Sequence, residues 1–521
     1  MMAAIMVRRI VVVGGGSAGF LAAITLKARL PDLHVRVIRS KEIGIIGVGE
    51  GSTVVLTGHL HGYLNIDFKE FYALADPQWK LGIRFIWGKR PFFDYAFDRQ
   101  LATRYPTLPK PPGYYFGDGD VAYAGLASAL MTENKVWPRR RDGMPHIIPN
   151  LAYHLENEKF VSFLEGYALR YGIEIVDDTI TEVRRGEAGV ACLRLASGTE
   201  IDADLFIDCS GFQSLMLGKT LGEPFCNFRP SLFCDRAVVG GWARTDEPIK
   251  PYTTAETMDA GWCWQIEHEH RINRGYVYGS SFISDGDAEA EFRAKNPRVG
   301  PTRIVKFVTG HYRRTWVDNV VAIGNASGFV EPLESTSLGF ICSESVWLAE
   351  ALADADREMR PSVVSLFNRR VSEGWETIRR FLALHYKFND RLDTPFWREC
   401  REKTDLAGAE QVVEYYQENG PSILWEKMLL HPDDQFTMDG YLSLLVGQRV
   451  PQRSGYVPSQ AEWRWWEQAV QNHQAVARHA YDVREALALV RSPRWTWPTN
   501  LYPPICARPP VRPVPQAAAV Q

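Results

Sequence analysis

The feature that most constrains the fold is a glycine-rich turn between a strand and a helix near the N-terminus. Residues 9–13 are rich in β-branched side chains, and Gly14, Gly16 and Gly19 follow in a GxGxxG pattern. Helix-forming residues then continue up to a proline, and a second apolar run follows at 34–40. A strand, a tight turn, a helix and a second strand within about 30 residues begin a dinucleotide-binding βαβ unit. The sequence therefore predicts a Rossmann-like α/β core.

The residues around this turn indicate how a dinucleotide would bind. Glycines let the backbone approach a pyrophosphate, and the helix start at Ser17 and Ala18 turns its positive dipole end towards the phosphates. The carboxylate expected about 20 residues further on, which binds the ribose, is absent. Arg39 and Ser40 stand there instead. Arginine would suit the phosphorylated ribose of NADP, or would stack on adenine while Ser40 binds the sugar. The turn alone leaves FAD and NADP open.

Two further strand-to-glycine turns occur far along the chain, at 203–212 and at 314–332. Such spacing predicts one nucleotide site assembled from distant segments. We expect a discontinuous dinucleotide-binding domain over 1–345 with an inserted substrate-side sheet, a mainly helical subdomain over 346–498, and a disordered proline-rich tail over 499–521.

Composition excludes several classes of function. The 521 residues include 59 basic and 62 acidic side chains without long runs of one sign, which argues against nucleic acid or a membrane surface as partner. The eight cysteines form no CxxC pair, and no His/Cys cluster has zinc spacing, so no metal site is expected. The apolar N-terminal start is interrupted by two arginines and is too short to span a membrane. We expect a cytoplasmic protein, a monomer or homodimer, with small-molecule partners.

Five motifs carry a more specific resemblance, because they occur in a fixed order along the chain. Together they resemble the flavin-dependent halogenases of the tryptophan halogenase family, and the resemblance extends to DTPFWREC at 393–400. The motifs are GVGEGS at 47–52, WKLGIRF at 79–85, DCSGFQSL at 208–215, WCWQI at 262–266 and GNASGFVEPLESTSLGF at 324–340. The resemblance implies a mixed α/β fold, in which a p-hydroxybenzoate-hydroxylase-type FAD-binding core (box) carries a helical C-terminal subdomain on the substrate side (pyramid).

The resemblance also implies an activity. Reduced FAD, dioxygen and chloride or bromide give hypohalous acid, which a tunnel passes to a lysine and then to an electron-rich aromatic substrate. Lys80 matches that lysine: its ammonium could hold the acid by hydrogen bonding or, once deprotonated, form a haloamine. The ordinary alternative is a solvated lysine. Glu334 matches a carboxylate that polarises the oxidant or accepts the ring proton, and Ser335 a serine that assists. Glu334 could instead serve the start of a helix, and both roles can hold together.

Further residues match the cofactor and halide sites of this family. Thr336 and Ser337 match the halide site, although the family usually has glycine at the second position. Residues 47–52, here called the strap, match a segment that crosses the flavin and links it to the halide site. The strap residues predicted to bind FAD are Val48, Gly49 and Glu50, and the residues predicted beside the isoalloxazine are Asn325 and Phe329.

The substrate side departs from members that act on tryptophan. Trp262 and Trp264 match a wall that keeps substrate away from the flavin, and Glu267 follows where the family has proline. Tyr95 and Phe97 are expected to line the tunnel or substrate site, but Asp94 and Tyr95 replace a His-Pro pair. We therefore expect an indole-type substrate other than free tryptophan, with pyrroles and phenols also open.

Two alternatives remain at this level. A flavin-dependent aromatic hydroxylase would share the FAD fold, but Lys80, the PLEST motif and the tryptophan pair argue against it. A non-catalytic FAD-binding regulator is the second alternative, and the presence of both catalytic-type residues argues against that. Because every glycine turn is assigned to one FAD site, reduced flavin is expected from a separate reductase.

Overall fold

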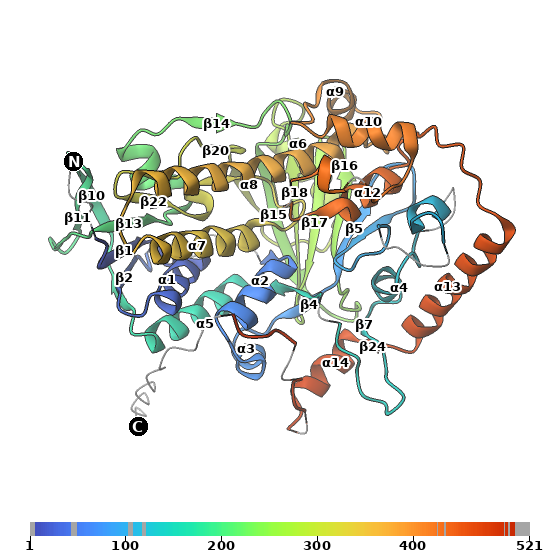
Figure 1. The fold of residues 1–521 in the computed structure, drawn as a ribbon, viewed down its shortest axis with the longest axis horizontal. Helices are drawn as coiled ribbons and strands as arrows, with labels where there is room; N and C mark the ends of the chain where they lie inside the picture. The colour runs from blue at the N-terminus through green and yellow to red at the C-terminus, as the bar shows by residue number, and fades with distance from the viewer. Residues whose placement is uncertain are drawn as a thin grey trace.

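The computed structural model describes residues 6–42, 49–102, 108–116, 121–148, 150–424, 426–431, 434–493, 495–498 and 501–505. Its architecture is mixed α/β, as the sequence predicted (Figure 1). One end of the molecule in Figure 1 is built on a parallel sheet flanked by long helices, and helices of the C-terminal third lie at the opposite end.

A six-stranded sheet, ordered β21-β22-β13-β1-β2-β9, is built from distant parts of the chain. Five of its strands are parallel, and β21 pairs antiparallel with β22. The strand predictions at 9–13, 34–40 and 205–207 are confirmed. The strands are β1 (Arg9–Val13), β2 (His34–Arg39), β9 (Glu174–Asp177), β13 (Leu205–Asp208), β21 (Trp316–Val317) and β22 (Val320–Ala322).

The strand order reverses beside β1, because β2 lies on one side of it and β13 on the other. The carboxyl ends of these strands meet at one edge, with Val13 opposite both Ile38 and Asp208. A ligand in an open α/β sheet binds at such a switch point. Asp208 holds the following turn, because its carboxylate accepts hydrogen bonds from the backbone N–H groups of Ser210, Met216 and Leu217 at 3.1, 2.7 and 3.1 Å.

Three helices lie beside this sheet. They are α1 (Ser17–Arg29), α5 (Asn157–Arg170) and α7 (Ser337–Asp354), and α1 packs against both others. The apolar side chains of α1 are buried in the main core, whereas Val11, Val13 and Phe206 point to a second core on the opposite face. The boundary predicted between residues 345 and 346 lies inside α7, and the domain limits stay a prediction.

A seven-stranded sheet, ordered β19-β15-β18-β17-β16-β5-β6, forms the middle of the molecule. Most neighbours are antiparallel, but β16 pairs parallel with β5, so the sheet joins two segments that are far apart in sequence. Its strands are β5 (Gly82–Ile86), β6 (Phe93–Ala96), β15 (Arg236–Ala243), β16 (Thr253–Met258), β17 (Gly261–Glu267), β18 (Arg271–Tyr278) and β19 (Arg303–Lys306).

A small sheet, β3-β8-β4, ties the strap to the middle of the molecule. β8 (Ala152–Leu155) lies between β3 (Glu50–Gly51) and β4 (Gln78–Lys80), and pairs antiparallel with both. The end of the strap and Lys80 therefore belong to one hydrogen-bonded unit.

The last third of the chain is mainly helical, as predicted. The long helix α8 (Pro361–Phe388) begins with proline at its first position and crosses above α7 in Figure 1. The helices that follow are α9 (Pro395–Lys403), α10 (Glu410–Asn419), α11 (Glu426–Leu429), α12 (Thr437–Gly447), α13 (Gln460–Arg478) and α14 (Val483–Val490).

Among the described residues, each helix is too short or too polar to cross a lipid bilayer.

Short elements complete the described chain. The remaining elements are α2 (Val54–Gly58), α3 (Phe68–Leu74), α4 (Leu126–Thr132), α6 (Asp285–Lys295), η1 (His59–Tyr63), η2 (Pro112–Phe116), η3 (Gly211–Gln213), η4 (Leu215–Thr220), η5 (Gly324–Ala326), β7 (Lys135–Trp137), β10 (Ile180–Gly186), β11 (Gly189–Leu195), β12 (Glu200–Ile201), β14 (Phe225–Asn227), β20 (Gly310–Tyr312), β23 (Gly328–Phe329) and β24 (Tyr481–Asp482).

The first glycine of the turn after β1 offers a test of the fold. Gly14 has a φ of 121°, and a Cβ there would lie 2.2 Å from the carbonyl oxygen of Cys209. We expect Gly14→Ala to lower the free energy of unfolding by about 2–3 kcal/mol, because it adds backbone strain and displaces β13. Gly166→Ala, inside α5 with no atom within 4 Å, should instead raise it by about 0.5–1 kcal/mol. Denaturant unfolding of both variants, without added cofactor, measures the contrast, and equal stabilities would contradict it.

Candidate active site

The glycine turn has the geometry that a dinucleotide requires. A Cβ on Gly19 would lie 1.8 Å from the carbonyl oxygen of Gly14, so this position must be glycine for helix and strand to pack. A Cβ on Gly16 would meet no atom within 4 Å. Gly16 precedes Ser17, where α1 begins, and no side chain caps that end of the helix. The backbone is thus bare where a pyrophosphate would approach, and the helix dipole favours an anion there.

The end of β2 holds a carboxylate that no motif indicated. The guanidinium of Arg39 forms an ion pair with Glu165 of α5, with 2.5 Å between Nη1 and Oε2. The hydroxyl of Ser40 lies 2.8 Å from that of Thr179, which follows β9. Glu165 therefore brings a carboxylate to this edge from a helix more than 100 positions further on, where no local motif could indicate it. A ribose-binding role for Arg39 stays a prediction.

Lys80 ends the short strand β4 and is completely buried. Its ammonium donates a hydrogen bond to the backbone carbonyl of Ser52 at 3.0 Å. Burial lowers the pKa of this amine to about 7, and the negative charge of Glu334 opposes part of that shift. The alternative interpretation, a solvated lysine, is wrong. Near neutral pH this amine can exist both with and without its proton.

The strap passes directly beside Lys80. A Cβ on Gly51 would lie 2.8 Å from the hydroxyl oxygen of Ser335, 3.2 Å from Lys80 Nζ and 3.3 Å from the hydroxyl oxygen of Thr253. Three polar side chains from separate elements therefore converge on one glycine. The structure brings together Lys80 and Ser335, which are 255 positions apart in the sequence.

Glu334 is buried in the loop before α7. Its Oε1 lies 2.7 Å from Nε2 of His385, while its Oε2 has no hydrogen-bond partner among the described residues. Burial raises the pKa of this carboxyl, and the neighbouring His385 and Lys80 lower it again in part. Ser335 follows with a φ of 55°, a left-handed conformation that costs a serine energy and is common at functional sites.

The N-terminus of α7 contains the predicted halide residues. Thr336 is its N-cap and Ser337 its first residue, and no side chain caps this end. The first backbone N–H groups of a helix have no partner inside the helix, so they are free to bind an anion. The hydroxyl of Thr53 comes close, 2.7 Å from where a Cβ on Gly339 would lie. Glu334 lies two residues before the cap and bonds to His385, so the structure does not support a capping role for its side chain.

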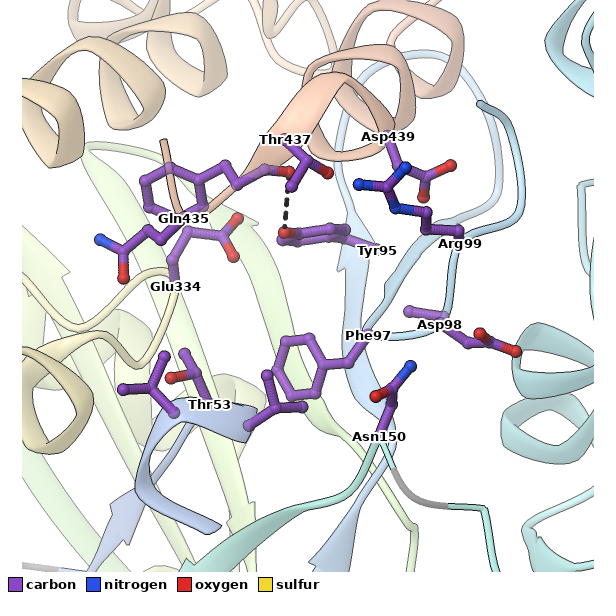
Figure 2. Close-up of a pocket in the computed structure, with 14 residues that line it drawn as sticks. Thr53, Tyr95, Phe97, Asp98, Arg99, Asn150, Glu334, Gln435, Thr437 and Asp439 are labelled. Atoms are coloured by element: carbon purple, nitrogen blue, oxygen red, sulfur yellow. Dashed lines mark hydrogen bonds between the residues drawn. The ribbon is translucent and has the colours of Figure 1, made fainter. Parts of the chain in front are cut away.

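A cavity of about 210 Å³ lies between β6, the start of α2 and the loop before α12. Figure 2 shows the Glu334 carboxylate turned into it, with Tyr95 and Phe97 on the opposite side. The hydroxyl of Tyr95 donates to the carbonyl oxygen of Phe436 at 3.4 Å. The lining residues are Thr53, Val54, Val55, Tyr95, Ala96, Phe97, Asp98, Arg99, Asn150, Glu334, Gln435, Phe436, Thr437 and Asp439.

Lys80 does not line this cavity but lies against its wall. Its Nζ is 5.2 Å from the centroid of the Phe97 ring, which does line the cavity. The cavity is therefore lined by Glu334 on one side, and the ring of Phe97 separates it from Lys80.

The tryptophan pair predicted as a wall lies on β17. Trp262 and Trp264 are buried on the main-core face of the sheet, and neither lines the cavity. Their role as a wall stays a prediction. Glu267, which replaces a proline of the family pattern, forms a buried ion pair with Arg244. Asp94 has a structural role, because its carboxylate binds the guanidinium of Arg84 through two hydrogen bonds of 2.8 Å.

The remaining residues predicted to bind the cofactor lie in several separate elements. Val48 lies outside the described residues. A Cβ on Gly49 would lie 2.5 Å from Nε2 of His268. Glu50 accepts a hydrogen bond from Asn157 at 3.0 Å, and burial raises its pKa to about 7. Asn325 lies in η5, and the Phe329 ring packs against Phe212 and Phe307 with centroids 4.9 and 5.1 Å apart.

Comparison with known proteins gives a consistent result. The family model for tryptophan halogenases matches residues 9–461. Tryptophan 7-halogenase RebH of Lentzea aerocolonigenes is 31% identical over 440 residues, which cover 78% of this chain and 82% of that protein. Among solved structures, MibH, a lanthipeptide tryptophan 5-halogenase, has a TM-score of 0.86 and 37% identity and covers 94% of both chains. Xcc4156, a flavin-dependent halogenase from Xanthomonas campestris, has a TM-score of 0.83 and 27% identity and covers 96% of this chain and 100% of that one.

The chain belongs to the tryptophan halogenase family. It is an oxidoreductase of the flavin-dependent halogenase type, which uses FAD to halogenate aromatic compounds. This confirms the family and the fold class predicted from the motifs. The bare backbone at Gly16, the open start of α1 and the switch point beside β1 fit FAD. No group of His, Cys, Asp and Glu within the described ranges is arranged to hold a metal ion.

The buried lysine of this halogenase gives a prediction about stability. In the unfolded chain Lys80 has a pKa near 10.5, and in the folded chain about 7, so the unfolded state binds more protons between these values. Wild-type stability should therefore rise with pH across this window, because the unfolded state progressively loses the proton that stabilises it relative to the folded state. We expect Lys80→Met to be more stable than wild type by about 2–4 kcal/mol at pH 6, with the difference falling towards pH 10.

Denaturant midpoints at several pH values measure this difference. The exposed Lys403→Met, at the end of α9, is the matched control and should show no such trend. A Lys80→Met effect that is constant with pH would contradict a lowered pKa for Lys80.

Proposed function

We propose that this enzyme passes hypohalous acid from the flavin to Lys80, which delivers halogen to an aromatic ring held in the cavity beside Glu334. The observation that carries the proposal is the completely buried ammonium of Lys80, against the strap on one side and Phe97 on the other. Bound reduced FAD supplies the electrons with which dioxygen and halide give hypohalous acid. The ammonium of Lys80 donates a hydrogen bond to this acid, or the neutral amine forms a haloamine with it.

Halide binds at the N-terminus of α7 in this proposal. The uncapped N–H groups beyond Thr336 attract an anion, and the strap passes close by at Gly51. Ser337 replaces the usual glycine, and its side chain adds a hydroxyl near the anion. Chloride and bromide are both candidates for this site.

The substrate is an indole-type ring, and three observations favour a ring that belongs to a larger molecule. The cavity reaches solvent at the exposed Arg99 and Gln435, so a ring could enter while the rest of its molecule stays outside. MibH, which is 37% identical, is described as a lanthipeptide tryptophan 5-halogenase. One oxygen of Asp439 in the cavity wall already accepts three backbone N–H groups, which makes it a weaker partner for a free amino group. We therefore propose tryptophan within a peptide as the preferred substrate.

A flavin hydroxylase is the second candidate, since it needs the same FAD fold. Such an enzyme has no need of a buried amine between flavin and substrate, and Lys80 therefore favours the halogenase. The described chain shows one nucleotide-binding sheet, so we propose that a separate reductase supplies reduced FAD.

The first experiment tests Lys80. We expect Lys80→Ala to lower halogenated product to below about 1% of wild type, because the transfer group is lost. Flavin oxidation should continue, because the lysine acts after hypohalous acid forms. Mass spectrometry of product and absorbance of the flavin measure the two, with FAD, reductase, NADH and bromide supplied.

Two controls accompany this variant. Lys403→Ala should keep wild-type activity. Lys80→Arg separates the two routes, because a guanidinium keeps its proton: it can donate a hydrogen bond to hypohalous acid but cannot form a haloamine. Product with an added oxygen in place of halogen would support the hydroxylase, and wild-type halogenation by Lys80→Ala would refute the proposed mechanism.

The second experiment tests the substrate class. A peptide with tryptophan between neutral residues should be halogenated at least about tenfold more efficiently than free tryptophan, because the charges of the free amino acid would lie unpaired at the cavity. Competition between the two substrates, read by mass spectrometry, gives the ratio of kcat/KM directly. Preference for the free amino acid would overturn this choice.

A further inference from the structure

A histidine outside every sequence motif contacts the catalytic carboxylate. His385 lies near the end of α8, and its side chain is completely buried. Its Nε2 is 2.7 Å from Oε1 of Glu334, and its Nδ1 is 3.1 Å from the backbone carbonyl oxygen of Phe381. Both ring nitrogens therefore have partners.

The partners of the two ring nitrogens determine how many protons His385 and Glu334 hold together; these two residues are called the pair below. A carbonyl oxygen only accepts, so Nδ1 carries a hydrogen. The second nitrogen then bears a proton only if the ring is an imidazolium. A bond of 2.7 Å to Glu334 needs one proton between the two atoms. The pair therefore holds a single shared proton and has no net charge, whether written as imidazole with acid or imidazolium with carboxylate.

The other oxygen of Glu334 is available for chemistry. Oε2 is buried and has no hydrogen-bond partner in the part of the chain that the structure describes. Glu334 also lines the cavity, and its carboxylate is turned into it (Figure 2). A buried polar atom without a partner is costly and needs an explanation. A substrate atom in the cavity would supply its partner.

Aromatic rings surround the histidine of this pair, and two titratable groups lie near its carboxylate. The rings of Phe85, Phe381 and Trp87 pack around His385 with centroids 5.0, 5.4 and 6.2 Å away. Of the charged or titratable groups near Glu334, Lys80 comes from β4 and Tyr95 from β6.

A second contact joins the same two segments. The hydroxyl of Tyr386, the residue after His385, donates to Glu331, three residues before Glu334.

We propose that His385 positions Glu334 and shares a proton with it, so that the two residues together accept the proton lost by the halogenated ring. The inference rests on the proposed halogenation in this cavity. After the carbon–halogen bond forms, the ring C–H bond breaks and its electron pair restores the aromatic ring. The proton goes to Oε2 of Glu334, and the shared proton moves fully to Nε2, which gives an imidazolium. The positive charge moves from the substrate ring to the Glu334–His385 pair, and the total charge is unchanged.

Without the histidine, Glu334 would be a poor base. Burial raises the pKa of its carboxyl and so favours the protonated form, which cannot accept the ring proton. His385 removes that obstacle because it can hold the proton in place of the carboxyl. His385 is thus a positioning residue, since it acts on substrate only through Glu334.

The test compares His385→Gln with wild type on an indole peptide carrying deuterium at the halogenated carbon. In wild type, loss of the ring proton should be fast, and no deuterium isotope effect should appear at neutral pH. In His385→Gln we expect halogenation to slow about a hundredfold and a primary isotope effect to appear, because proton loss now limits the rate. Its rate should recover as pH rises, at values where wild type has reached its plateau. Lys80 titrates in both proteins and does not produce this difference.

A double variant checks that the residues act as a unit. Glu334→Gln/His385→Gln should be no slower than Glu334→Gln alone, because the histidine has no other route to the substrate. Independent losses that multiply would overturn the proposal. So would a slow His385→Gln variant without an isotope effect, since a purely structural defect predicts that result.

Wild-type protein provides a test that needs no variant, in case His385→Gln does not fold. As pH falls, Oε2 of Glu334 takes up a proton and can no longer accept the proton lost by the ring, so halogenation should slow and the isotope effect should appear. The same isotope effect at every active pH would overturn the shared proton. If wild type makes no halogenated product under any condition, the proposed function fails first, and this inference fails with it.

Discussion

The burial of one ammonium group is the constraint on which the site depends. Lys80 lies at the end of a three-residue strand, with the strap, Ser335 and Phe97 around it, and its ammonium donates a hydrogen bond to the carbonyl of Ser52. Such burial costs stability, which the large apolar core of this chain offsets. In return the amine is close to its neutral form at physiological pH, where a lysine in water would be fully charged.

Burial acts on the carboxyl of Glu334 as well, and it shifts the pKa of this group in the opposite direction. Burial disfavours the charged form of Glu334 as it does that of Lys80, so each group is pushed towards neutrality. Their mutual attraction favours the charged forms and opposes that push. Small changes in this environment, such as a bound anion or substrate, can therefore redistribute protons between them. A site that must move both a halogen and a proton benefits from groups balanced in this way.

Local sequence patterns predicted the parts of this structure that depend on neighbours in the chain. The strand, glycine turn and helix at the N-terminus were predictable because period and turn chemistry are local properties. The burial of Lys80 was also predictable, because Trp79 and an apolar run of residues flank it in the sequence. His385 and Glu165 were not predictable. Each reaches its partner through the packing of a helix from a distant segment, and neither lies in a motif. The cavity beside Tyr95 likewise combines residues from β6, α2 and α12, which no single stretch of sequence brings together.

Gly51 has a consequence for the sequence of the strap. A Cβ at this position would lie 2.8–3.3 Å from polar atoms of Ser335, Lys80 and Thr253. Even one methyl group there would have to displace the serine hydroxyl or the strap itself. The missing side chain is therefore what lets the backbone of the strap lie against the amine, and any larger residue would hold the two segments apart.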